Sequence, residues 1–276
     1  MSYPVGLPSD NPIVTLTHPT PIIWVLELHN GEDSRINETL IDKALQPALN
    51  IVERDWREGW RAARKAKDKD GGGGALIIVG KRGQNKFFSN GLELDKLRSD
   101  PHSAHNFTPL VHNPWLRRLL AFPIPTVAAI NGHCFAAAMM LALCCDYRVM
   151  TDGSSRRAWM CMNEIHFGAA YPLSFASIIR TKVPDPRTQR KVALEGHHFT
   201  PPEALQAGLV DFLVKGDTEA VIAKAQAVGE SVARMATAGA WGVIKRDLYR
   251  DALEASARDD LLQQIDADDA AAKARL

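Results

Sequence analysis

The sequence carries almost no net charge, because 33 Lys and Arg balance 32 Asp and Glu over 276 residues and leave a formal charge of +1. This balance gives no reason to expect nucleic acid or a membrane surface as the main partner. Cysteine is also scarce, and the four that occur are Cys134, Cys144, Cys145 and Cys161. They form no CxxC pair and have no histidine at zinc-ligand spacing. We therefore expect no metal site and interpret them as buried thiols in a reducing compartment.

A long apolar run suited to a membrane is also missing. The least polar stretch, Leu119 to Cys145, has no Asp, Glu, Lys or Arg, but Pro123 and Pro125 break its first part and Asn131-Gly132 its middle. Neither half reaches the roughly 20 apolar residues of a spanning helix. We expect no membrane span, and interpret the stretch as a buried strand, 126–130, a tight turn, and an apolar helix, about 136–145. The N-terminal residues also lack the features of a secretory signal.

What the sequence contains is a succession of strand and helix patterns, which predicts an α/β fold. The strands are expected at 13–17, 22–28, 75–79, 126–130, 147–150, 158–162 and 209–214. Besides 136–145, helices are expected at about 37–70 with an interruption near Pro47, from about 92, and at 171–181, 186–195, 202–207, 217–236 and 240–272. The glycines 71–74 precede a strand, so they indicate a connector and not a phosphate loop. Residues 99–114 are expected to form a loop or lid with weak helix, and we expect no metal at its His102 and His105.

Two places repeat one arrangement, in which a strand leads through a turn of small residues into the start of a helix. One follows strand 75–79 and ends at Ser89-Asn90-Gly91-Leu92, and the other follows strand 126–130 and leads to Ala136-Ala137-Ala138. The start of a helix leaves backbone N–H groups unpaired and favours negative charge. Two such groups that converge on one point would form an oxyanion hole, although the sequence alone does not show convergence.

Four blocks of sequence resemble the crotonase (enoyl-CoA hydratase/isomerase) superfamily and occur in the family's order. FSNGLEL at 88–94 resembles FSAGxDL, and PTVAAING at 125–132 followed by AAAMMLALCCD at 136–146 resembles P-x-I-A-A-V-N-G-x-x-x-GGG-x-E-L-A-L-x-C-D. NEIHFG at 163–168 is similar to N-E-x-x-L-G of the enoyl-CoA isomerase branch, and FTPPEALQAGLVD at 199–211 resembles the segment before the family's C-terminal helices. The resemblance is closest to peroxisomal Δ3,Δ2-enoyl-CoA isomerases.

The resemblance implies a crotonase-like spiral of ββα units over residues 1–200 and a C-terminal helical region over 201–276 that serves packing and oligomerisation. Family members usually assemble as trimers or pairs of trimers. The implied substrate is an acyl-CoA thioester, with no cofactor beyond the CoA of the substrate itself. Its carbonyl oxygen would accept hydrogen bonds from the N–H groups of Leu92 and Ala137. The implied substrate-binding residues are Ser89, Asn90, Gly91, Glu93, Ala136 and Met140.

The choice of reaction depends on carboxylates. The family's hydratases use two glutamates, and the first of these positions is Met140 here, whose thioether cannot transfer a proton. The second is Glu164, and a single carboxylate can carry a proton from C2 to C4 of an enolate. This pattern implies conversion of 3-enoyl-CoA to trans-2-enoyl-CoA in the β-oxidation of unsaturated fatty acids. His166 is a second candidate, because in an extended segment it would share a face with Glu164.

One departure from the family pattern keeps alternatives open. The family's GGG run is Ala136–Ala138 here, and three methyl groups would crowd the approach of the thioester. Alanine tolerates helical backbone angles, so we expect the N–H groups of this run still to donate. A hydratase-like enzyme and an inactive acyl-CoA-binding or scaffold protein remain the alternatives to an isomerase.

The sequence finishes with Ala274-Arg275-Leu276, which has the small-basic-Leu chemistry of a peroxisomal address. Together with the implied function, this predicts a peroxisomal location and recognition by the peroxisomal import receptor.

Overall fold

The computed structural model describes residues 2–99, 106–258 and 265–275. Its larger sheet has the strand order β1-β2-β3-β4-β6-β8-β10. The first two pairs are antiparallel and the other four are parallel. The strands are β1 (Val5–Leu7), β2 (Val14–Thr20), β3 (Ile23–Leu28), β4 (Ala75–Val79), β6 (Thr126–Ile130), β8 (Tyr147–Thr151) and β10 (Phe212–Val214).

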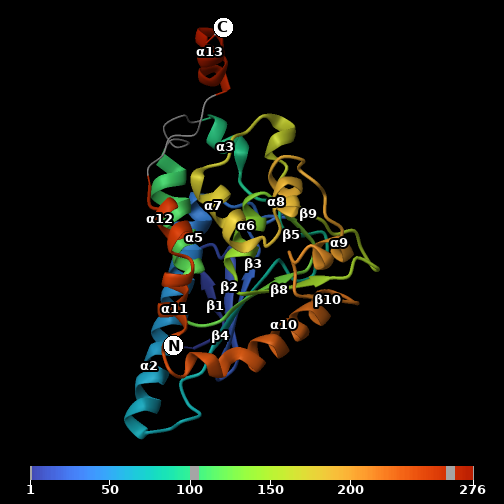
Figure 1. Ribbon diagram of the computed structural model, residues 1–276. Helices are drawn as coiled ribbons and strands as arrows, with labels where there is room; N and C mark the ends of the chain where they lie inside the picture. The colour runs from blue at the N-terminus through green and yellow to red at the C-terminus, as the bar shows by residue number, and fades with distance from the viewer. Residues whose placement is uncertain (1, 100–105, 259–264, 276) are drawn as a thin grey trace.

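A second, smaller sheet is parallel and has the order β5-β7-β9, formed by β5 (Phe87–Ser89), β7 (His133–Phe135) and β9 (Met160–Cys161). Each of its strands follows a strand of the larger sheet, and a helix follows in turn: α3 (Leu94–Ser99), α6 (Ala137–Cys144), and the 3₁₀ turn η3 (Glu164–Phe167) with α7 (Leu173–Lys182). This repetition confirms the predicted spiral of ββα units (Figure 1). The sequence patterns had indicated neither β5 nor β7, nor the edge strand β1.

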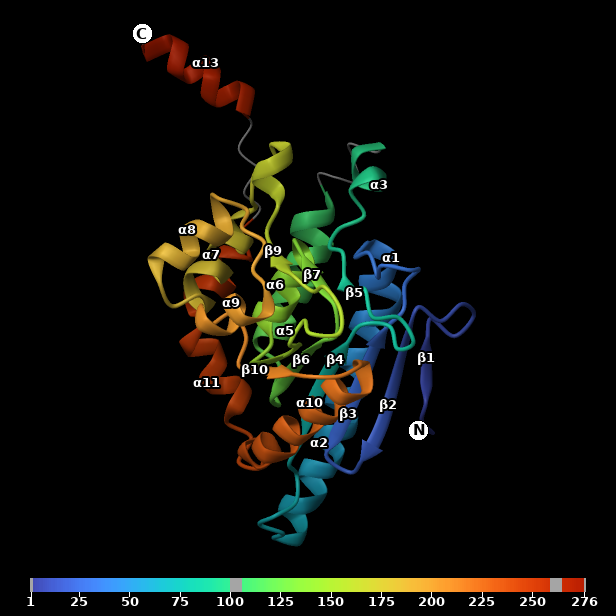
Figure 2. The ribbon, with the colours of Figure 1, turned by 90° about the vertical axis from the view of Figure 1, so that its right-hand side faces the viewer.

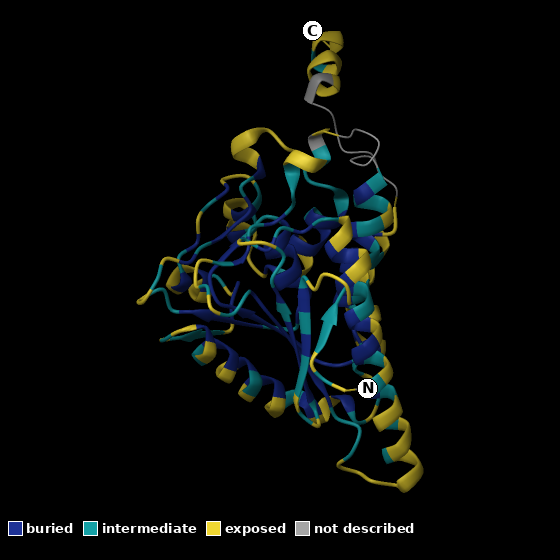
Figure 3. Ribbon diagram, turned by 180° about the vertical axis from the view of Figure 1, so that it is seen from behind, coloured by how far each residue is buried: buried dark blue, intermediate teal, exposed yellow. Residues whose placement is uncertain are grey.

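Helix α10 (Thr218–Ala233) runs along one face of the larger sheet, where its apolar residues pack on β3, β4, β6 and β8 (Figure 2). The opposite face carries the main core, which includes α2 (Gln46–Ala66), α5 (Asn113–Leu120) and α6. Every residue of α6 is buried, as expected for a helix that is apolar on all sides. Figure 3 shows the same division, with burial concentrated in the sheets and exposed residues along the outer sides of α2 and α10. No helix among the described residues is long and apolar enough to span a membrane.

Helix α1 (Glu38–Leu40) continues through a π-helical turn, η1 (Ile41–Leu45), into α2. Pro47 stands in the first turn of α2, so the interruption that Pro47 predicted lies just before it. The remaining elements are α8 (Pro186–Ala193), α9 (Pro201–Gln206), η4 (Arg234–Ala236), α11 (Trp241–Leu248), α12 (Arg250–Ala255) and α13 (Ile265–Arg275). Strand β10 pairs with β8, so residues after 200 contribute to the larger sheet.

Two predicted segments differ from the structure. Residues from Phe107 onward are more helical than the predicted loop or lid with weak helix, because a π-helical turn, η2 (Phe107–His112), leads directly into α5. Pro114 lies in the first turn of α5, where a helix needs no backbone N–H. His102 and His105 lie outside the described residues. The predicted helix 240–272 is also not continuous: it breaks at Tyr249, whose ring covers the ammonium group of Lys182 at 4.6 Å.

Candidate active site

The three strands of the smaller sheet end at the same edge, because they are parallel neighbours. Directly after β5 come Asn90, Gly91 and Leu92, directly after β7 come Ala136 and Ala137, and after β9 comes Glu164. A hydrogen bond of 2.7 Å from the Ala136 N–H to the Cys161 carbonyl ties the second segment to the third. The sheet thus brings the three sequence-predicted segments together, although they are far apart in the chain (Figure 2).

The first two segments are in direct contact at Gly91. A Cβ atom placed on Gly91 would lie 2.8 Å from the Phe135 carbonyl oxygen, 2.9 Å from the Ala136 Cβ and 3.3 Å from the Ala137 nitrogen. Gly91 also has a φ angle of +77°, which side chains rarely adopt. Only glycine therefore allows this close approach. As a result, the backbone that carries the Leu92 N–H packs against the start of α6.

The two backbone N–H groups at this contact are unused. Within the described part of the chain, neither the Leu92 N–H nor the Ala137 N–H donates to another group. Ala137 is the first residue of α6, so its N–H also lies at the positive end of the helix dipole. The arrangement suits a small acceptor that develops negative charge, such as a carbonyl oxygen on the way to an oxyanion.

The polar side chains of the first turn hold the turn in place. The Ser89 hydroxyl donates to the Ser34 carbonyl at 2.7 Å, and the Asn90 side chain donates to Asp33 at 2.9 Å. Glu93 accepts a hydrogen bond of 2.6 Å from Asn37. In the structure the side chains of these three residues hydrogen-bond to the segment 33–37, and their contact with substrate stays a prediction. Met140, which lies in α6, is fully buried in the protein core.

The backbone of Ala136 differs from expectation. Helical angles were expected for the whole run Ala136–Ala138, but Ala136 has φ +52° and ψ −123°, and helix α6 begins at Ala137. A side chain at positive φ is strained, typically by about 1–3 kcal/mol. The glycine that the family pattern has at this position would relieve that strain.

We therefore expect Ala136→Gly to stabilise the fold by about 1 kcal/mol, the relieved strain less the entropy that glycine costs. Urea denaturation measures this difference. Ala138→Gly is the matched control, since Ala138 lies inside α6 and its replacement should cost about 1 kcal/mol. Equal destabilisation by both variants would contradict the interpretation of Ala136 as strained.

Glu164 is a buried carboxyl group at this edge. Its residue is 9% exposed, and its Oε2 atom is buried without a hydrogen-bond partner among the described residues. Burial raises the pKa of its carboxyl from 4.5 to about 7, because water no longer stabilises the charge. A carboxyl with a pKa near neutrality can both accept and return a proton at physiological pH. Nearby, the hydroxyl of Tyr171 is also buried and unpaired, a feature that no sequence motif signalled.

His166 does not share a face with Glu164, contrary to the sequence-based expectation. The segment is not extended but forms the 3₁₀ turn η3, in which residues two apart point in different directions. The His166 Nε2 atom lies 3.1 Å from the Gly196 carbonyl oxygen. This contact ties η3 to the loop that follows α8. His133, the first residue of β7, is buried among Phe87, Phe135 and Trp159.

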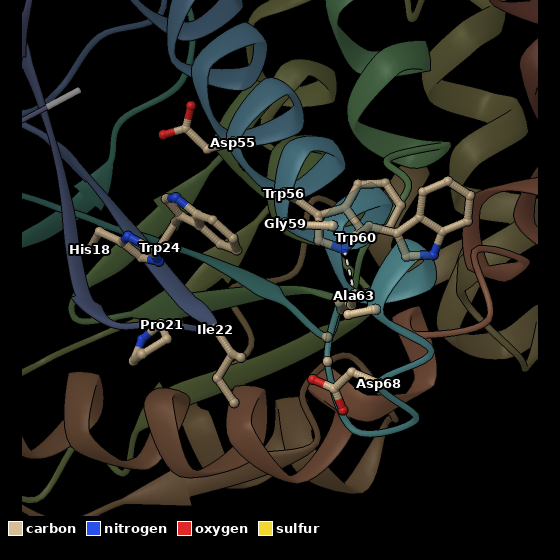
Figure 4. A pocket seen from close by; sticks show the side chains of 15 residues that line it. His18, Pro21, Ile22, Trp24, Asp55, Trp56, Gly59, Trp60, Ala63 and Asp68 are labelled. Atoms are coloured by element: carbon tan, nitrogen blue, oxygen red, sulfur yellow. Dashed lines mark hydrogen bonds between the residues drawn. The ribbon is translucent and has the colours of Figure 1, made fainter.

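A cavity of about 490 Å³ opens elsewhere, between the β2–β3 turn, α2 and the glycine run (Figure 4). Its walls include three tryptophans, Trp24, Trp56 and Trp60, and a histidine, His18, stacked on Trp24 at 4.4 Å. None of the residues that line it is a predicted site residue, so this cavity is separate from the candidate active site.

A spiral of ββα units followed by a helical C-terminal region is the crotonase fold. The chain belongs to the enoyl-CoA hydratase/isomerase family, whose model matches residues 46–274. It is 33% identical over 189 residues to enoyl-CoA delta isomerase 3 of Arabidopsis thaliana, covering 67% of this chain and 77% of that protein. It is 28% identical over 235 residues to the peroxisomal enoyl-CoA delta isomerase 1 of the same plant, covering 84% and 88%.

The fold is also that of solved family structures. A crystal structure of an enoyl-CoA hydratase from Mycobacterium ulcerans matches with a TM-score of 0.72 and 24% identity, over 88% of this chain and 94% of that chain. The isomerases similar to this chain include peroxisomal proteins of Arabidopsis thaliana and a mitochondrial protein of Mus musculus.

Proposed function

We propose that this family member is a Δ3,Δ2-enoyl-CoA isomerase. The thioester carbonyl oxygen of a 3-enoyl-CoA accepts hydrogen bonds from the Leu92 and Ala137 N–H groups, which stabilises the enolate formed when a proton leaves C2. Glu164 takes that proton and returns it at C4, so the double bond moves from C3 to C2. Atoms and charge balance without a redox partner or a metal.

The main support for the proposal is that the buried carboxyl of Glu164 and the unused N–H groups of Leu92 and Ala137 all follow strands that end at the same edge of the smaller sheet. Loss of one oxyanion donor typically costs about 3–4 kcal/mol of transition-state stabilisation, so the amides can supply a large part of the catalysis. A hydratase of this family would need a second carboxylate to activate water, and the matching position is the thioether of Met140. The names of the similar isomerases support the same choice.

The test is to mix the purified protein with 3-hexenoyl-CoA and follow the ultraviolet absorbance of the conjugated 2-enoyl thioester. We expect conversion of this substrate and little hydration of crotonyl-CoA, because no second carboxylate activates water. Rapid hydration of crotonyl-CoA would identify a hydratase. Binding of CoA esters without either reaction would identify an inactive binding protein.

We also propose a peroxisomal location, supported by the small-basic-Leu chemistry of residues 274–276 and by the peroxisomal relatives. A fluorescent protein fused to the N-terminus should co-localise with a peroxisomal marker, and removal of the last three residues should leave the fusion outside peroxisomes. Mitochondrial fluorescence, or peroxisomal fluorescence that survives the removal, would overturn the proposal.

A further inference from the structure

Two buried oxygen atoms near the candidate active site lack hydrogen-bond partners in the described part of the chain. They are Oε2 of Glu164 and the hydroxyl oxygen of Tyr171. Leaving a buried polar atom unpaired is costly, so such atoms indicate a contact made in another state of the molecule or with a ligand. A carboxylate oxygen only accepts and a neutral phenol can donate, so the two groups are chemically complementary.

The backbone brings the two side chains into the same region. After η3, Gly168 adopts a left-handed conformation, and the Ala169 N–H returns to the Glu164 carbonyl at 3.0 Å. The chain thus folds back on Glu164 just before Tyr171, which precedes α7. Burial, and after it the nearby carboxylate of Glu164, raise the pKa of the Tyr171 phenol well above its ordinary value. Tyr171 therefore keeps its proton at neutral pH and can act only as a donor to the carboxylate.

The segment between the two residues, 165–170, is exposed, and its backbone is held by the hydrogen bond from Ala169 to Glu164 and by the contact of the His166 ring with Gly196. A hydrogen bond between the hydroxyl and the carboxylate therefore depends on the rotamers of the two side chains. Tyr171 is also packed against Phe175 of α7, with ring centroids 6.3 Å apart, which keeps the ring beside the site.

We infer that Tyr171 is a positioning residue that donates a hydrogen bond to Oε2 of Glu164 in the working enzyme and leaves Oε1 free to exchange the proton with substrate. This inference rests on the proposed function for its catalytic meaning. The hydrogen bond fixes the rotamer of the carboxylate and favours its charged form. Without it, burial alone would hold Glu164 protonated up to a higher pH.

The test is the pH dependence of kcat/KM for wild type and Tyr171→Phe with 3-hexenoyl-CoA. We expect the apparent pKa of the acidic limb to rise by about one unit in the variant, because a hydrogen bond to a charged group is lost. At a pH below the limb the variant should be about tenfold slower, with KM almost unchanged. Tyr147→Phe is the matched control, since Tyr147 is a half-buried tyrosine of β8 away from this edge, and its profile should match wild type.

A second readout separates this inference from the proposed function. Carbon-13 NMR of glutamate carboxyl groups, with the Glu164 signal assigned from Glu164→Gln, reports the titration of Glu164 without any turnover. A raised titration midpoint in Tyr171→Phe supports the hydrogen bond even if 3-hexenoyl-CoA is not converted, in which case the proposed function alone fails. If wild type converts the substrate and neither the rate profile nor the NMR midpoint moves in Tyr171→Phe, the inference about Tyr171 is wrong.

Discussion

Glu164→Gln is expected to lower the isomerisation rate by at least about 10³-fold, because glutamine has the shape of glutamate but cannot take the proton from C2. Positioned acid–base groups typically contribute about 10²–10⁴-fold, and here one group serves both proton transfers. The measurement is kcat with 3-hexenoyl-CoA at pH 8, where the carboxyl of Glu164, with a pKa of about 7, is mostly charged. Affinity for the CoA ester should persist, since the amides of Leu92 and Ala137 are unchanged.

The same substitution should stabilise the fold at alkaline pH. The folded protein holds the Glu164 proton up to about pH 7, whereas the unfolded chain releases it near 4.5, so stability falls as pH rises between these values. The full penalty is about 3 kcal/mol, from about 1.4 kcal/mol for each pKa unit. Glutamine carries no charge and escapes this penalty.

Urea denaturation at pH 4 and pH 8 measures the effect. Glu164→Gln should exceed wild type by about 3 kcal/mol at pH 8 and by little at pH 4. Glu230→Gln, on the exposed side of α10, is the matched control and should show no pH-dependent difference. A variant that retains the wild-type rate, or a gain in stability that is equal at both pH values, would contradict the role and the burial assigned to Glu164.

The sequence could predict the turns and the carboxylate of the candidate site but not the sheet that gathers them. Strands β5 and β7 have three residues each, too few for an alternating pattern to be visible, whereas β9 lies inside the predicted strand 158–162. Their positions depend on pairing between segments about 25–45 residues apart in the chain, which local sequence does not encode. The family motifs supplied the missing long-range information.

Backbone detail was also beyond the sequence. The residue type of Ala136 favours a helix, but tertiary contacts with Gly91 and Cys161 hold it outside helical angles. Similarly, the pattern of 240–272 is helical throughout, yet packing of Tyr249 on Lys182 coincides with the break after α11. Asp146 is the last residue of the AAAMMLALCCD block. The motif suggested no role for it, but in the structure its side chain makes many contacts.

The carboxylate of Asp146 connects three parts of the fold. It forms an ion pair with Lys245 of α11 at 2.8 Å, and both side chains are almost fully buried, 6% and 5% exposed. It also accepts hydrogen bonds from the Thr126 N–H at 2.9 Å, the Thr126 hydroxyl at 3.0 Å and the Trp241 indole at 3.3 Å. Asp146 thereby joins the start of β6 and the end of α6 to the C-terminal helices.

Asp146→Ala should therefore destabilise the fold by about 3–5 kcal/mol, because it leaves the buried ammonium group of Lys245 without a counter-charge and the Thr126 N–H without an acceptor. Lys245→Met should cost less, since Thr126 and Trp241 still donate to the carboxylate. The double variant should lose less than the sum of the two, because removing both charges leaves neither one buried alone. Urea denaturation of all four proteins at one protein concentration and pH 7 measures these differences. Additive losses, or an Asp146→Ala variant as stable as wild type, would show that the ion pair does not hold the C-terminal helices to the core.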